Sequence, residues 1–201
     1  MELAAALLLA LATVATAWSA YQSRQWTGAQ SQGYSKATAS RIAVNRAAAV
    51  ANRQVQIDVA TFIQWVDARE QGRAGLATFY RTRFRAEFRR AFDAWLARMP
   101  FSNQRAPRTP FEMPQYRLRA SAEADRLEAT AAAGSERAKA ANERADNYML
   151  AVVLFASALF FAGLSTKLRS SRAAALILGL GAIVFVATVI WLAFLPIRVS
   201  I

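Results

Sequence analysis

The sequence has no cysteine and no histidine among its 201 residues. Without cysteine, the chain has no disulfide framework, no thiol nucleophile and no thiolate metal site. Without histidine, it lacks the usual proton shuttle near neutral pH and the commonest metal ligand. We therefore expect no catalytic, cofactor-binding or metal-binding residues. Carboxylate chemistry would have to use residues such as Glu123, Asp125 and Glu128, and helical spacing explains these as a solvated face.

Acidic residues are scarce as well, with 13 against 25 basic residues and a net charge of +12. Arginine supplies 22 of the basic residues and alanine is abundant, which is typical of a genome rich in G and C. The alternative explanation is attraction to anionic lipid or nucleic acid. Because acidic residues are interspersed among the basic ones, composition is the favoured explanation. We expect no nucleic-acid partner.

Three apolar runs are each long enough to cross a hydrocarbon core of about 30 Å as a helix. They lie within residues 1–21, 148–166 and 173–197. Residues 1–21 also resemble a signal peptide with an Ala-Thr-Ala cleavage site, but Glu2 in place of a basic residue favours an uncleaved anchor. None of the runs carries a charge at depth, which argues against a transporter made from one chain.

Residues 117–166 predict one helix that passes from water into the membrane. Small or apolar residues recur there at alternating steps of four and three, a heptad pattern. The members are Ala120, Ala124, Leu127, Ala131, Gly134, Ala138, Ala141, Ala145, Tyr148, Val152, Phe155, Leu159, Ala162 and Thr166. We expect a continuous packing seam, with an aromatic helix at residues 76–99 as the bulky neighbour of its small side chains.

Residues 22–147 predict a helical bundle outside the membrane. A helix is expected at residues 35–68, with an apolar seam at Val55, Val59, Phe62 and Val66. For residues 22–35, the glycines leave a bend or a straight, closely packed helix open. A glycine-rich turn at residues 71–75 precedes the aromatic helix at 76–99. Its Leu76, Tyr80, Phe84, Phe88, Phe92 and Trp95 share one side and its arginines lie opposite. A bundle core is the favoured interpretation and a membrane-surface helix is the alternative.

Residues 100–116 contain four of the five prolines and predict an extended loop. Its apolar residues can pin the loop to the helices or present an edge to a partner. The candidate interaction surface combines them with arginines of the preceding helix. Its members are Arg83, Arg89, Arg90, Phe111, Met113 and Tyr116.

The predicted fold class is all-α, with three transmembrane helices and a three-helix extramembrane bundle whose helices continue into the membrane. Lys167, Arg169 and Arg172 in the loop 167–172 predict a cytoplasmic location for that loop. Residues 22–147 then lie outside the cytoplasm, with a short tail at 198–201. In the last span, Ala175 and Gly179 form a small-xxx-small pattern suited to helix contact.

The segment 79–118 combines an arginine- and phenylalanine-rich helix with a proline loop that ends in Phe-x-Met-Pro-x-Tyr, here Phe111 to Tyr116. With the downstream run LFASALFFAG, it resembles a group of uncharacterised bacterial membrane proteins over about residues 55–165. The resemblance implies the topology and a bacterial source. It transfers no activity and no functional residues.

The expected function is that of a non-enzymatic protein of the bacterial inner membrane. It would act as a scaffold or accessory subunit that contacts the lipid bilayer and either itself or another membrane protein, with no cofactor. Two alternatives remain open. One is an extracytoplasmic sensor or ligand-binding module that signals through a partner, and the other is a homo-oligomeric channel lined by Thr13, Thr16 and Ser157.

Overall fold

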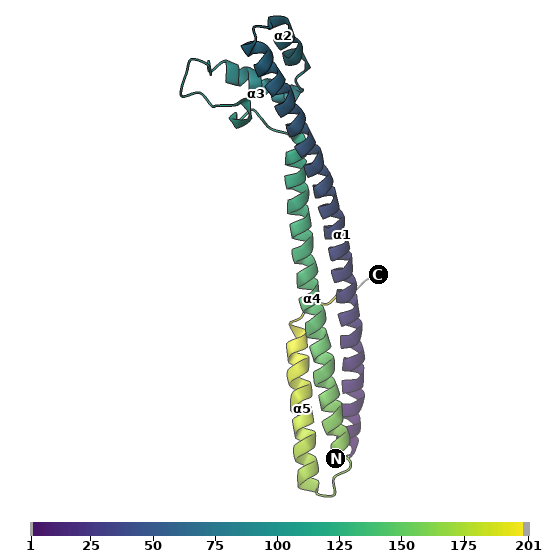
Figure 1. Ribbon diagram of the computed structural model, residues 1–201. Helices are drawn as coiled ribbons and strands as arrows, with labels where there is room; N and C mark the ends of the chain where they lie inside the picture. The colour runs from purple at the N-terminus through teal and green to yellow at the C-terminus, as the bar shows by residue number, and fades with distance from the viewer. Residues whose placement is uncertain (1, 199–201) are drawn as a thin grey trace. The chain divides into compact units, whose positions relative to one another are not determined.

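In the computed structural model (Figure 1), residues 2–198 form five α-helices, one 3-10 helix and no strand. The predicted all-α class is therefore confirmed. The elements are α1 (Glu2–Glu70), α2 (Ala74–Arg83), α3 (Ala86–Leu96), η1 (Pro110–Glu112), α4 (Arg119–Ser165) and α5 (Ser171–Ala193). Helices α1, α4 and α5 are long and apolar enough to cross a membrane. Residue 1 and residues 199–201 of the predicted tail lie outside the described part.

The chain divides into two compact units. Unit 1 comprises Met1–Ala37 and Ala133–Ile201, and unit 2 comprises Thr38–Ala132. Helix α1 runs without a break through residues 22–35, so this part of the chain is continuous helix, as one of the two predicted alternatives has it. The expected turn at residues 71–75 is confirmed, because α1 ends at Glu70 and α2 begins at Ala74.

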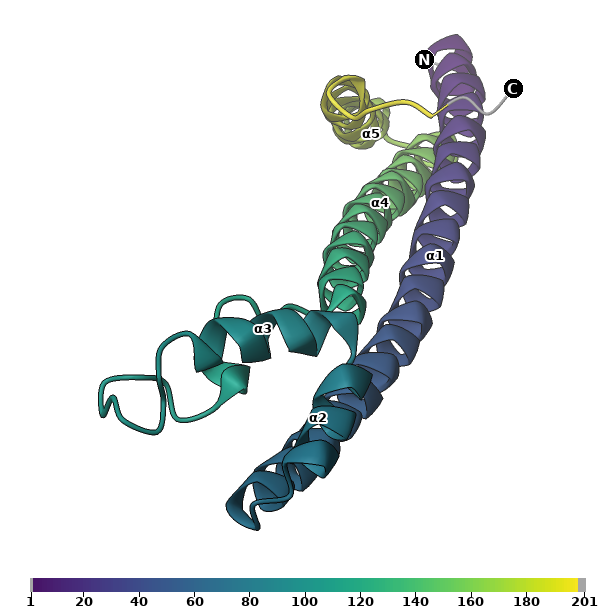
Figure 2. The same ribbon diagram turned by 90° about the horizontal axis from the view of Figure 1, so that it is seen from above.

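In unit 1, the facing parts of α1 and α4 run side by side and meet through their smallest residues (Figure 1, Figure 2). A Cβ atom on Gly33 would lie 2.9 Å from the Cβ of Ala138. A Cβ atom on Gly134 would lie 3.4 Å from the Cβ of Ala37. The expectation that aromatic side chains cover this seam is therefore wrong. Small residues on both helices let the two backbones approach closely instead.

The buried face of α4 follows the predicted seam from Ala131 to Tyr148 and again at Phe155 and Ala162. Beyond Tyr148, the other buried positions are Ala151, Ala158 and Ser165. Each lies one residue before the position that the heptad pattern predicted. Helix α5 packs on this part of α4. The rings of Phe155 and Phe185 lie 5.5 Å apart.

Helix α5 uses a different set of small residues from the one predicted. Its buried residues are Ala174, Gly181 and Thr188, spaced seven apart. A Cβ atom on Gly181 would lie 3.2 Å from the carbonyl oxygen of Ala158, whereas Ala175 is exposed and a Cβ atom on Gly179 would meet no described atom within 4 Å. The predicted small-xxx-small contact is therefore wrong in register. The helix also starts and ends earlier than 173–197, and Ser170 caps its first turn.

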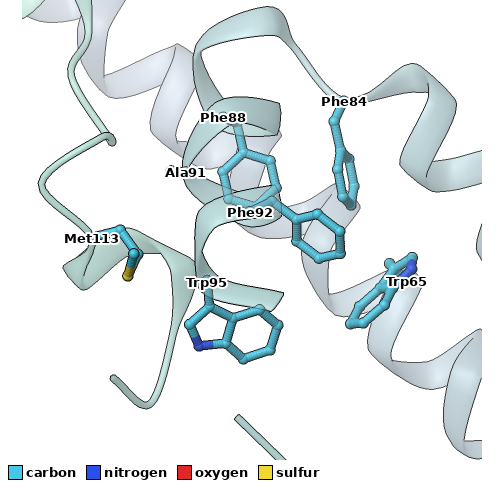
Figure 3. Packing of buried hydrophobic residues seen from close by; sticks show 7 residues of the cluster. All are labelled: Trp65, Phe84, Phe88, Ala91, Phe92, Trp95 and Met113. Carbon is cyan, nitrogen blue, oxygen red and sulfur yellow. The ribbon is translucent and has the colours of Figure 1, made fainter. Parts of the chain in front are cut away.

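Unit 2 is built around an aromatic core (Figure 3). The rings of Trp65 and Phe92 lie 4.7 Å apart, and those of Phe84 and Phe88 lie 4.9 Å apart. We use the name aromatic core for the buried set and the rings packed on it. Its members are Phe62, Trp65, Tyr80, Phe84, Phe88, Ala91, Phe92, Trp95, Phe111, Met113 and Tyr116.

The single helix predicted at residues 76–99 is wrong, because the structure has two helices there. Phe84 and Arg85 between them are extended, with ψ angles of 139° and 145°. This break turns Phe84 into the aromatic core and Arg85 towards Asp58. Every residue of α2 is at least partly exposed, including Leu76, which the pattern assigned to the core. The predicted three-helix bundle is therefore not confirmed.

Candidate functional site

A tight turn follows α3 in unit 2, and we call residues 99–102 the Met99 turn. The backbone N–H of Met99 donates to the carbonyl of Leu96 at 2.9 Å. The N–H groups of Ser102 and Asn103 both donate to the Met99 carbonyl, at 3.1 and 2.9 Å. Met99 has a φ angle of +50°, a left-handed conformation that is uncommon outside glycine, asparagine and aspartate. Such conformations persist where the surroundings fix the chain and often occur at functional sites.

The Met99 turn presents apolar side chains to the surroundings. Met99 is 66% exposed and Phe101 is 53% exposed. The guanidinium of Arg69 lies 3.9 Å from the Phe101 ring centre, and the Trp95 ring packs on Phe101 at 5.6 Å. The indole N–H of Trp95 donates to the carbonyl of Pro107 at 2.8 Å. The turn is therefore an exposed apolar feature held in a fixed conformation.

A buried polar cluster supports the aromatic core in unit 2. The fully buried Asp58 accepts from Arg85 Nη1 at 2.7 Å and from the Tyr116 hydroxyl at 3.1 Å. Arg85 also forms an ion pair with Glu87, whose second carboxylate oxygen accepts from the backbone N–H of Arg119 at 3.2 Å. The cluster therefore joins α1, the start of α3, the end of the proline loop and the start of α4.

Burial dominates the electrostatics of this cluster. Desolvation raises the pKa of the Asp58 carboxyl, against the opposing effects of Arg85 and Tyr116. Burial and the neighbouring Asp58 charge raise the pKa of the Tyr116 hydroxyl far above its ordinary value. Asp58 Oδ1 and Gln54 Oε1, one helical turn apart, are buried with no hydrogen-bond partner among residues 2–198. Arg85, Tyr116 and the second carboxylate oxygen of Asp58 pair inside the fold, which fits a structural role.

The predicted interaction surface divides into two parts. Phe111 stacks on Phe88 at 5.0 Å, Met113 is buried, and Tyr116 binds Asp58, so these three residues belong to the interior. Arg83, Arg89 and Arg90 are exposed. Arg83 lies over the Phe79 ring at 3.5 Å, and Arg89 donates to the backbone carbonyls of Thr82 and Phe84. Arg83 and Arg89 therefore both contact residues of α2, and Arg89 also contacts the residue that follows this helix.

The remaining predicted residues lie on the surface. Lys167 and Arg169 are in the turn between α4 and α5, and Arg172 is in the first turn of α5. Glu123 forms an ion pair with Arg126 at 2.7 Å. Asp125 and Glu128 are exposed on α4. Among residues 2–198, no group of three or more acidic side chains is placed to hold a metal ion.

Sequence reasoning missed Asp58, Arg85 and the Met99 turn. A signal for Asp58 was present, since it lies seven residues after the buried Ala51 and seven before the buried Trp65. It is also the only acidic residue between Glu2 and Asp67. No local pattern marks Arg85 among its neighbouring arginines or the positive φ angle of Met99.

Comparison of the chain with protein-family models, curated proteins and solved structures finds no match. The resemblance to bacterial membrane proteins therefore stays a prediction.

Proposed function

We propose that this chain is a non-enzymatic protein of the bacterial inner membrane and an accessory subunit of a membrane assembly. Helices α1, α4 and α5 anchor it, and unit 2 lies outside the cytoplasm and binds another protein through the Met99 turn. The observation that carries the proposal is the exposure of Met99 and Phe101 on a fixed turn. Methionine and aromatic residues are enriched where proteins bind one another.

The fixed conformation of the turn favours binding. Association loses affinity when flexible side chains and loops must be ordered. Here Trp95 and Arg69 already hold Phe101, and the backbone hydrogen bonds to the Met99 carbonyl already close the turn. A hollow of about 300 Å³ beside Phe101, lined also by Leu96 and Pro100, offers room for a partner side chain.

Charge indicates the kind of partner. Residues 97–109 contain Arg98, Arg105 and Arg108 and no acidic residue. Residues 38–132 as a whole carry 16 basic and 9 acidic side chains, a net charge of +7. Like charges oppose the pairing of two such surfaces, and opposite charges favour encounter. The expected partner is therefore a different membrane-associated protein with an acidic surface around an apolar recess.

Photo-crosslinking in native cells tests this proposal. A photoreactive phenylalanine analogue is placed at Phe101 and, as the matched control, at Phe79, which is 45% exposed on α2. We expect one discrete adduct with another protein from position 101 and none from position 79. The substitution Met99→Asp should abolish that adduct. Equal adducts from both positions, or an adduct of the chain with itself, would contradict the proposed role of the turn.

A further inference from the structure

We propose that unit 1 contains a binding site for the phosphate of an anionic lipid headgroup. The site is a groove of about 320 Å³ between α1 and α4, which we call the basic groove. Its polar and aromatic walls are Trp26, Gln32, Lys36, Arg137, Arg144 and Arg198. The inference rests on the membrane location in the proposed function and is independent of the protein partner.

The groove follows from the close packing of the two helices. Gly33 and Gly134 lie on its floor with Ala138 and Ala141. Because these residues have almost no side chain, the helix backbones approach and leave a shallow channel above the contact. The long basic side chains that project beside this channel form its walls.

The charge of the groove is of one sign. It has four basic side chains, and no acidic residue lines it in the described part of the chain. None of these four residues is in an ion pair within residues 2–198. The guanidiniums of Arg144 and Arg198 lie over the same Trp26 ring, 4.6 and 5.6 Å from its centre. A bound anion would offset the repulsion between them, and guanidinium groups match the geometry of phosphate oxygens.

Buried hydrogen bonds hold the wall formed by Arg198 in place. The fully buried Gln22 accepts from the Arg198 backbone N–H at 3.0 Å and donates to its carbonyl at 3.1 Å. The indole N–H of Trp26 donates to the Pro196 carbonyl at 3.2 Å, and the Tyr148 hydroxyl donates to the same oxygen at 3.3 Å. Two arginines distant in sequence are therefore brought together before any ligand binds.

The position of the groove favours a lipid as the source of the phosphate. The uncharged run of α4 begins at Asn147, and Arg144 lies three residues before it. Tryptophan and tyrosine are enriched at the level of lipid headgroups, and the exposed Trp18 and Tyr21 lie where the apolar run of α1 ends. The end of the groove nearest Trp26 and Arg144 therefore lies close to the membrane surface. Arg137 and Lys36 extend the positive charge away from the bilayer, where the rest of a headgroup would lie.

Lipid binding to the detergent-purified full chain tests the inference, with retained lipids counted by native mass spectrometry. The probes are phosphatidylglycerol, phosphatidylcholine, and inorganic phosphate as a competitor. We expect tighter binding of phosphatidylglycerol than of phosphatidylcholine. Arg144→Gln and Arg198→Gln should each weaken phosphatidylglycerol binding about tenfold, the effect of losing one hydrogen bond to a charged group. The matched control is Arg24→Gln, which removes an exposed arginine of α1 outside the groove and should leave binding unchanged.

Three results would overturn the inference. These are equal binding of the two lipids, an equal loss in the Arg24→Gln control, and displacement of phosphatidylglycerol by inorganic phosphate at similar concentration. Thermal melting of each variant shows whether it is folded. Reconstitution into phosphatidylcholine vesicles separates the two proposals. A chain that inserts into these vesicles, but binds both lipids equally in detergent, contradicts only the basic groove. A chain that stays in water without detergent contradicts the proposed function.

Discussion

Asp58 occupies the middle of the packed face of α1 in unit 2, between Ala51 and Trp65. A hydrophobic residue at such a position often gives equal or greater stability than a buried ion pair. The carboxylate instead selects particular neighbours, because only a chain that brings Arg85 and Tyr116 to it satisfies one of its oxygens. The break between α2 and α3 places Arg85 where its guanidinium reaches Asp58.

The buried carboxyl predicts an unusual dependence of stability on pH. The pKa of Asp58 is raised in the folded chain above its ordinary value of 3.8. Its neutral form is therefore favoured by folding, and the resulting stability is present below pH 3.8 and lost as pH rises through the raised pKa. The free energy of unfolding of the wild type, minus that of Asp58→Asn, should fall as pH increases over this interval. Denaturant unfolding followed by tryptophan fluorescence measures it, and a difference that grows with pH would contradict the assignment.

The aromatic core predicts a second effect at the residue scale. Phe88 is fully buried and contacts the rings of Phe84 and Phe111. Phe88→Ala should lower the free energy of unfolding by about 3–5 kcal/mol, because it removes buried apolar surface and leaves a cavity. Phe79→Ala is the matched control on exposed α2, where only contacts such as that with Arg83 are lost, and should cost about 1 kcal/mol or less. Equal losses in the two variants would show that Phe88 is not part of a packed core.

Sequence reasoning identified many core residues but not the polar one among them. The aromatic residues Phe84, Phe88, Phe92 and Trp95 follow helical spacing and are buried as expected. Asp58 was missed because periodicity counts apolar residues, and a carboxylate on the buried face has no place in that count. Its partner Arg85 lies far along the chain, so the pair depends on tertiary structure.

At the scale of the helices, the glycines of α1 give a matched pair. A Cβ atom on Gly33 would lie 2.9 Å from that of Ala138, whereas a Cβ atom on Gly28 would meet no described atom within 4 Å. Gly28→Ala should stabilise the protein by about 1 kcal/mol through helix propensity alone. Gly33→Ala should lower the melting temperature, because the close approach of α1 and α4 must open and overpacking costs about 1–3 kcal/mol. Thermal unfolding in detergent, followed by circular dichroism, measures both changes. Equal gains in stability would contradict the close contact.

Helix positions were predictable where the pattern was long, and helix partners were not. The seam of α4 was identified because small residues recur over many turns. The helix that packs against this seam was predicted wrongly, because a seam of small residues fits either a bulky neighbour or another seam of small residues. Beyond Tyr148, α4 also packs on α5, a third helix that the repeat within α4 does not encode.

At the scale of the whole molecule, three helices long and apolar enough to cross a membrane were predictable, because long uncharged runs are visible in the sequence. The boundaries of these helices were less predictable, because the start of α5 after Ser170 and its end at Ala193 depend on local hydrogen bonds. The Met99 turn was not predictable, because no local sequence pattern encodes the positive φ angle of Met99 or the contacts of Phe101 with Trp95 and Arg69.

We propose that α1, α4 and α5 cross the membrane and that residues 38–132 lie outside the cytoplasm. Because the chain has no cysteine, a single introduced cysteine is its only thiol, and labelling therefore reports on that position alone. Arg90→Cys places a thiol at an exposed position of α3, and Lys167→Cys places one in the turn between α4 and α5. With a membrane-impermeant maleimide, we predict labelling of position 90 in intact spheroplasts and labelling of position 167 only after the spheroplasts are lysed. Labelling of position 167 in intact cells, with position 90 protected until lysis, would contradict this account.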